Sequence, residues 1–170
     1  MKDFIFIIGP SGIGKTTLAK SLYNHYKGVY FEQNMIPEFG IPGGVDEGKF
    51  EEEVMWESSI KLLRYFYEKG FRNIIALDFN DLRTKEIPIL FKGTKFITLK
   101  LVSSDYGQNR NQMITRGENG LIDLELMEIS TKKIMSRELL PNEVIIDIAS
   151  KSKEEVAKEA INLIDTYEAN

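Results

Sequence analysis

The sequence contains no cysteine and a single histidine, His25. Disulfide bonds, thiolate nucleophiles and cysteine-ligated metal centres are therefore excluded, as is any site that needs two imidazoles. Long hydrophobic runs are also missing, and none approaches the roughly 20 residues that span a bilayer. The first apolar run, Phe4–Ile8, is too short for the core of a signal peptide. We therefore expect a cytoplasmic protein with no membrane partner.

Positive charge is not in excess, because 22 lysines and arginines stand against 26 acidic residues and give a net charge of −4. A protein that binds nucleic acid through a broad basic surface has the opposite balance, so no nucleic-acid partner is expected. The 42% hydrophobic and 28% charged residues are typical of a globular chain. A length of 170 residues favours a single domain over residues 1–170 and leaves the oligomeric state open.

Short apolar runs alternate with helical patterns along the whole chain. The predicted strands are 3–8, Val29–Glu32, 73–77, 95–101 and 143–148. The runs 3–8 and 73–77 are typical of buried parallel strands, whereas 95–101 alternates between polar and apolar residues. Segments with helical periodicity or polar helical composition are Lys15–Tyr26, 50–69, 103–117, 122–137 and 152–167. A glycine- and proline-containing loop is expected over 33–48. The pattern predicts an α/β fold whose five-stranded parallel sheet is covered on both faces.

The strongest chemical signal is the run Gly9-Pro10-Ser11-Gly12-Ile13-Gly14-Lys15-Thr16, which fits G-x-x-x-x-G-K-[ST], the Walker A pattern. A predicted strand precedes it and a predicted helix follows it, as the pattern requires. Glycines let backbone amides turn inward around an anion, and the helix N-terminus adds further amides. A strand-to-helix turn that binds nothing is the alternative, but the pattern and its context favour a bound nucleoside triphosphate, expected to be ATP. The residues predicted to hold it are Gly9, Ser11, Gly12, Ile13, Gly14, Lys15, Thr16 and Thr17.

Lys15 is predicted to place its charge on the β and γ phosphates, while the Thr16 hydroxyl is predicted to ligate Mg²⁺. Asp78 ends the third predicted strand, so it is expected at the same edge of the sheet. There it can support Mg²⁺ or take a proton from an incoming hydroxyl. The alternative is that Asp78 caps the following segment, although Asp81 is the better capping candidate for residues 82–90.

Arg110 and Arg116 lie in a polar segment that runs into Gly117 and Gly120. Two cations flanked by glycines suit a lid, at about residues 103–120, that closes on the transferring phosphate and excludes water. The alternative is a solvated helix with two surface arginines.

Three weaker candidates concern the substrates. Glu32 follows the second predicted strand and can meet an acceptor hydroxyl or amine, unless it is an ordinary loop carboxylate. Trp56 can stack on a substrate ring, although core packing is the more common fate of a tryptophan. The loop 149–151 can pass an adenine ring or can simply lead from a strand into the last helix.

The strand, Gly9–Thr16, Asp78 and the arginine pair, followed by a fifth strand and a last helix, resemble the P-loop small-molecule kinases. This family includes nucleoside monophosphate kinases, shikimate and gluconate kinases and chloramphenicol phosphotransferase-like proteins. The resemblance implies a three-layer P-loop NTPase fold with a five-stranded parallel sheet and a helical lid. It also implies ATP and Mg²⁺ as cofactors, with Lys15, Asp78, Arg110 and Arg116 as catalytic residues.

Two functions follow from these patterns. The first is a kinase, a transferase that moves the γ-phosphoryl group of ATP to a small-molecule acceptor such as a nucleoside, a nucleotide or a related metabolite. The second is an ATP-binding regulatory ATPase or switch module. The Asn-Lys-x-Asp motif of GTPase switches and the Leu-Ser-Gly-Gly-Gln motif of transporter ATPases are both missing from the sequence, which favours the kinase.

Overall fold

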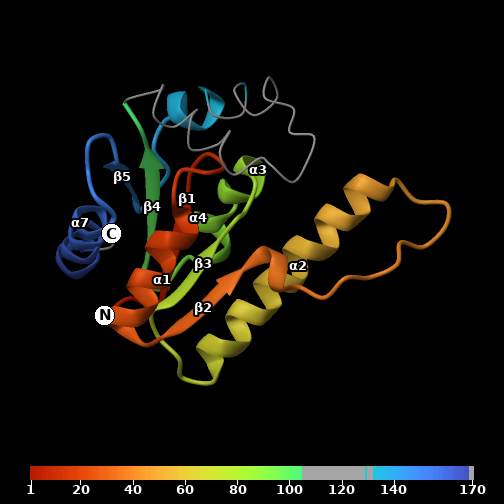
Figure 1. Ribbon diagram of the computed structural model, residues 1–170. Coiled ribbons are helices and arrows are strands. Elements are labelled where there is room, and N and C mark those ends of the chain that lie inside the picture. Colours follow the sequence, from red (N-terminus) through yellow and green to blue (C-terminus); the bar gives the residue numbers. More distant parts are fainter. Residues whose placement is uncertain (105–128, 130–131, 169–170) are drawn as a thin grey trace.

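A five-stranded parallel sheet forms the centre of the protein in a computed structural model that describes residues 1–104, 129 and 132–168 (Figure 1). The strands are β1 (Phe4–Ile8), β2 (Val29–Glu32), β3 (Ile74–Leu77), β4 (Phe96–Val102) and β5 (Glu143–Asp147). Their order in the sheet is β2-β3-β1-β4-β5, and every neighbouring pair is parallel. The predicted fold class is confirmed.

Helices cover both faces of this sheet and make a three-layer molecule. One face is covered by α1 (Lys15–Tyr26) and α7 (Lys153–Thr166), and the other by α2 (Glu47–Glu68) and α4 (Ile87–Leu90). The short helix α3 (Asp81–Thr84) follows β3, and the 3-10 helix η1 (Gln33–Met35) follows β2. Residues 132–136 are also helical. Within the described ranges, no helix is both long enough and apolar enough to cross a membrane.

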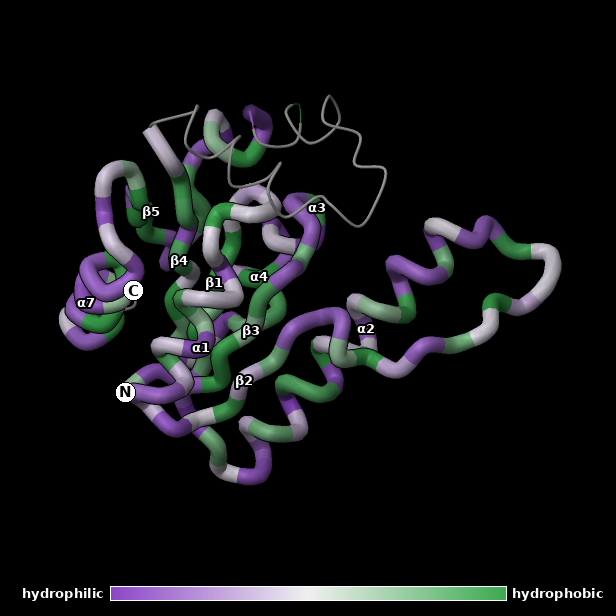
Figure 2. Tube along the Cα trace, in the orientation of Figure 1, coloured by the Kyte–Doolittle hydropathy of each residue, from purple (hydrophilic) through white to green (hydrophobic). Residues whose placement is uncertain are grey.

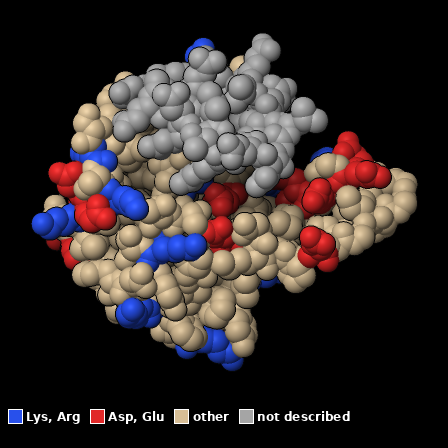
Figure 3. All heavy atoms as spheres, in the orientation of Figure 1, with Lys and Arg blue, Asp and Glu red and all other residues tan. Residues whose placement is uncertain are grey.

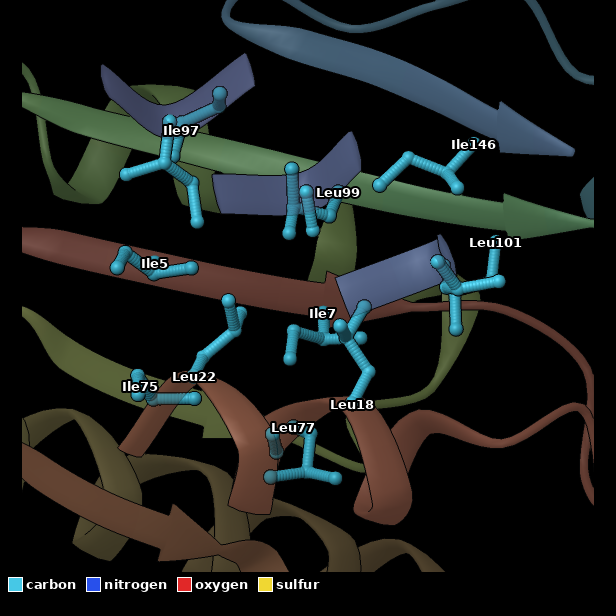
Figure 4. Close-up of a cluster of buried hydrophobic side chains, with 14 of the residues drawn as sticks. Ile5, Ile7, Leu18, Leu22, Ile75, Leu77, Ile97, Leu99, Leu101 and Ile146 are labelled. Carbon is cyan, nitrogen blue, oxygen red and sulfur yellow. The ribbon is translucent and has the colours of Figure 1, made fainter. Parts of the chain in front are cut away.

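Each face of the sheet has its own hydrophobic core. Ile5 and Ile7 lie on the α1 face in one core with Leu18 and Leu22 (Figure 4). Phe4 and Phe6 belong to the core on the opposite face. Side chains alternate along a strand, so a strand buried on both faces must be apolar at every position. This is why β1 shows a continuous apolar run, and why the strands are the most hydrophobic part of the chain in Figure 2.

The helix starts follow local capping chemistry. The α2 helix begins at Glu47, ahead of the predicted residue 50, because the Asp46 carboxylate accepts a hydrogen bond from the Lys49 amide at 3.1 Å. The predicted start of the last helix is confirmed, since Ser152 and Glu155 form a capping box at the start of α7.

The segment after β3 differs from the prediction. Residues 82–90 do not form one helix capped by Asp81; they form the two single turns α3 and α4. The cap of α3 is Asn80, whose side-chain oxygen accepts from the Arg83 amide at 2.9 Å. Pro88 lies in the first turn of α4 and has no amide hydrogen, so a continuous helix would lose a hydrogen bond there.

Candidate active site

The glycine-rich loop joins β1 to α1 at the carboxyl edge of the sheet. Gly9, Gly12 and Gly14 have φ angles of 148°, 75° and 109°, which side-chain-bearing residues rarely adopt. A Cβ atom on Gly9 would also lie 2.8 Å from the carbonyl oxygen of Leu101 in β4. The backbone of this loop therefore requires glycine at both positions where the Walker A pattern fixes it.

The N-terminus of α1 differs from those of α2 and α7, because no side chain caps it and its first turn carries no acidic residue. Its N-cap is Gly14 in the left-handed conformation. First-turn amides of a helix have no partner within the helix and, with the positive end of the helix dipole, attract an anion. The geometry suits the predicted phosphate cradle.

The position of this loop in the sheet also favours ligand binding. The chain leaves β1 through α1 to reach β2 on one side, whereas β4 and β5 lie on the other side of β1. Ligands of open α/β sheets bind at the carboxyl edge, at the point where the strand order reverses in this way.

Lys15 and Asp78 meet at this edge. The Lys15 ammonium lies 3.1 Å from the carbonyl oxygens of both Gly9 and Pro10, and 3.5 Å from the Asp78 carboxylate. Asp78 has a φ angle of 71°, and residues in this sparsely populated region cluster at functional sites. Because Asn80 caps α3, Asp78 does not have the alternative capping role and its carboxylate faces the loop lysine.

A cavity of about 310 Å³ lies beside the loop. Its lining residues are Ile13, Gly14, Thr17, Leu18, Leu101, Ile148, Lys151, Lys153 and Val156. The walls are mostly apolar side chains, which suit the faces of a planar base. Lys151 borders the cavity, so the loop predicted to pass the adenine ring does lie next to the phosphate loop.

The two substrate candidates lie on different faces of the sheet. Glu32 is 9% exposed and accepts a hydrogen bond from the hydroxyl of Tyr30, which packs on the α1 face. Trp56 is 4% exposed and belongs to the core on the α2 face. Its indole nitrogen donates to Glu86 at 3.0 Å, and its ring meets Phe79 edge-on at 5.2 Å. The structure therefore gives both side chains internal partners and does not bring the two together.

The predicted lid lies almost entirely outside the described residues, and so do Arg110 and Arg116. The described chain before it ends at Ser104, whose amide donates to the Asp147 carboxylate at 3.1 Å. The amide of Ala149 donates to the same carboxylate at 3.0 Å. The hydrogen bond from Ala149, with those from Ser104, lowers the pKa of Asp147. Asp147 thus fixes the end of β5 next to the start of the predicted lid.

A group of buried charges lies next to the turn that follows β3, and it was not predicted from the sequence. We call it the buried ion cluster, and it consists of Asp81, Lys100, Arg137 and Glu143. Arg137 bridges Asp81 at 3.0 Å and Glu143 at 2.6 Å, and its carbonyl oxygen accepts from the Lys100 ammonium at 2.9 Å. The signal for it in the sequence is Lys100, which lies between two leucines in the strand predicted over 95–101.

Acidic side chains dominate the part of the surface next to α2. Residues 46–53 contain five carboxylates and one lysine. Figure 3 shows acidic groups in a hollow near the centre of the visible face and along the projecting end of α2. Glu52 from this stretch binds Arg83 at 2.7 Å and accepts a hydrogen bond from the side-chain nitrogen of Asn80 at 2.7 Å, and thereby ties α2 to the turn that carries Asp78.

Comparisons with known proteins place the fold. No protein-family model and no curated protein sequence matches the chain. Among solved structures, it is similar to a sugar kinase from Janibacter sp. HTCC2649, with 18% identity, a TM-score of 0.71 and coverage of 97% of this chain and 95% of that one. A gluconokinase from Sinorhizobium meliloti 1021 gives 14% identity, a TM-score of 0.68 and coverage of 96% and 92%. The tunicamycin resistance protein of Deinococcus radiodurans gives 17% identity, a TM-score of 0.62 and coverage of 100% of this chain and 99% of that one.

These similarities extend over nearly the whole of each chain, and at such identities they establish the fold. The chain has the fold of the P-loop small-molecule kinases, and the resemblance predicted from its phosphate loop and element order is confirmed.

Proposed function

We propose that the protein is an ATP-dependent kinase that transfers the γ-phosphoryl group to a hydroxyl of a small-molecule acceptor, such as a nucleoside, a nucleotide or a related metabolite. The observation that carries this proposal is the meeting of Lys15 and Asp78, 3.5 Å apart, at the mouth of the glycine loop. A phosphate-binding cation and a carboxylate at one point are the two groups that phosphoryl transfer to a hydroxyl requires. The kinase names of the sugar kinase and gluconokinase neighbours support it.

The residues around the loop fit Mg²⁺ and ATP. The glycine-loop amides would hold the phosphates, and the neighbouring cavity of about 310 Å³ would take the base. Thr16 and Asp78 supply oxygen donors, which Mg²⁺ prefers. The described residues contain no group of three or more His, Asp or Glu that could hold a metal alone, so phosphate oxygens and water would complete the ligand set. When bound, Mg²⁺ neutralises charge that develops on the phosphates.

The chain contributes charge stabilisation and proton transfer. Lys15 stabilises the negative charge on the transferring phosphoryl group. Asp78 accepts the proton of the acceptor hydroxyl. At the same time the acceptor oxygen forms a bond to the γ-phosphorus, and the bond between that phosphorus and the ADP oxygen breaks. Arg110 and Arg116 are proposed to bind the same phosphates from the lid and to exclude water.

ATP consumption measured against a panel of small acceptors tests this proposal. One acceptor is expected to stimulate ADP release with matching formation of a phosphorylated product. Lys15→Met should abolish turnover, and Asp78→Asn should lower kcat by about 10²–10⁴-fold. Lys20→Met, which removes an exposed lysine of the same helix, serves as the matched control and should remain active. Stimulation only by a protein or a nucleic acid would favour the regulatory ATPase instead.

A further inference from the structure

The buried ion cluster joins four separate parts of the chain, and one of its members, Asp81, lies three residues after Asp78. Asp81 begins α3, Lys100 lies in β4, Arg137 follows the helical residues 132–136, and Glu143 begins β5. The Arg137 and Asp81 side chains are 9% and 12% exposed, and that of Glu143 is fully buried. Burial alone would lower the pKa of Arg137, but hydrogen bonds and charge from Glu143 and Asp81 raise it above its usual value. Arg137 therefore stays charged between two carboxylates.

Asp81 depends on Arg137 more than Glu143 does. Within the described part of the chain, the hydrogen bond from Arg137 Nε is the one that the Asp81 carboxylate receives. Its second oxygen, Oδ2, is buried and receives none, with the Lys85 ammonium 3.8 Å away. Glu143, by contrast, also accepts from the Leu140 amide at 2.9 Å.

The turn 78–81 is held by side chains from three directions. Lys15 contacts its first residue, Asp78, at 3.5 Å. Glu52 of α2 accepts from the Asn80 side-chain nitrogen at 2.7 Å, and Arg137 holds Asp81 at 3.0 Å. Asp78 sits in the left-handed conformation, with a φ angle of 71°, and such a conformation persists where its surroundings hold it.

We propose that Arg137 is a positioning residue, which through Asp81 holds the turn 78–81 so that the Asp78 carboxylate faces Lys15 in the site. This inference rests on the proposed function, in which Asp78 receives the acceptor proton. None of the hydrogen bonds that the Arg137 side chain makes to described residues goes to Asp78, so Arg137 acts on it through Asp81 and the two residues between them.

Loss of Arg137 leaves Asp81 buried without its hydrogen-bond donor, so the carboxylate must move toward water and carry the turn with it. A displacement of about 1 Å at a reacting group can cost on the order of 10²-fold in rate. Lysine would not replace Arg137 fully, because it cannot hold Asp81 and Glu143 with one planar, forked group.

A double-mutant cycle tests the coupling. Arg137→Met should lower kcat at least about tenfold in the natural sequence and by no more than about twofold in the Asp78→Asn background, since its effect passes through Asp78. Arg72→Met is the matched control, since it breaks a 3.0 Å ion pair with Asp3 at the opposite edge of the sheet and should leave kcat near that of the parent.

An equal loss in both backgrounds, no loss, or an equal loss in Arg72→Met would overturn the proposal. A measurement independent of turnover is the ¹³C NMR shift of the Asp78 carboxyl, which should move in Arg137→Met and in the milder Arg137→Lys but not in Arg72→Met. An unmoved signal would overturn the positioning role. Absence of acceptor phosphorylation by the parent protein would refute the proposed function alone, because the NMR comparison still decides the position of Asp78.

Discussion

Replacement of Gly9 by alanine tests the geometry of the phosphate loop. The new Cβ would lie 2.8 Å from the Leu101 carbonyl oxygen and 3.2 Å from the Ile13 Cγ2 atom. The φ angle of 148° adds a second penalty, because it disfavours any residue with a side chain. The loop must therefore move away from β4, and its amides must leave the positions that suit a phosphate.

The expected loss of stability in Gly9→Ala has two separable parts. Backbone strain of this kind costs about 1–3 kcal/mol, and insertion of a methyl group into a packed contact costs about another 1–3 kcal/mol. Gly14 provides the matched control, since its φ is 109° but a Cβ there would have no atom within 4 Å. We expect Gly14→Ala to show the strain alone, and Gly9→Ala to be less stable by about a further 1–3 kcal/mol.

Equilibrium unfolding in urea, followed by the fluorescence of the single, buried tryptophan, measures both variants. Calorimetry with MgATP measures the second consequence, a weaker nucleotide affinity in Gly9→Ala. If Gly9→Ala proved as stable as Gly14→Ala and bound MgATP like the parent, the close approach of the loop to β4 would be refuted.

Two further predictions concern α2. Trp56→Phe should cost about 1–3 kcal/mol of stability in urea unfolding, followed by circular dichroism, because it removes the hydrogen bond to Glu86. Its KM values for MgATP and for the acceptor should not change if Trp56 is a core residue, and a raised acceptor KM would restore its substrate role. The hydrogen bond from Arg83 lowers the pKa of Glu52 below its ordinary 4.5. The resulting stabilisation is present above that ordinary value and is lost as pH falls through the folded-state pKa. In Glu52→Gln the free energy of unfolding should therefore fall less steeply as the pH is lowered than it does in the parent. An unchanged dependence on acidic pH would contradict this assignment.

Much of the fold could be predicted because its signals are local. The strands β1 and β3 are buried on both faces, so they appear as continuous apolar runs, and α1 follows directly from the glycine loop. The start of α2 was placed too late because its first turn is polar and a single side-chain cap, Asp46, determines it. The break at Pro88 was missed because a one-turn helix has too few residues to show a period.

Part of the arrangement around the glycine loop also follows from local signals. The phosphate loop is contiguous, so its residues could be read in order, and Asp78 follows from the rule that parallel strands end at one edge. The pairing of Arg137 with Asp81 could not be predicted, since it joins a residue beyond β4 to one beyond β3 and neither lies in a periodic pattern. The internal partners of Glu32 and Trp56 likewise depend on which face of the sheet each residue meets.

Isothermal titration of the protein with MgATP shows directly whether the glycine loop holds a triphosphate. We expect saturable binding to one site per chain, weakened about tenfold or more in Lys15→Met, because one hydrogen-bonded charge contributes about 1.5–3 kcal/mol. Lys20→Met should bind like the parent. No heat of binding in the parent protein, or equal affinity in the parent and Lys15→Met, would contradict the assignment of Gly9–Thr16 as the site that holds the triphosphate.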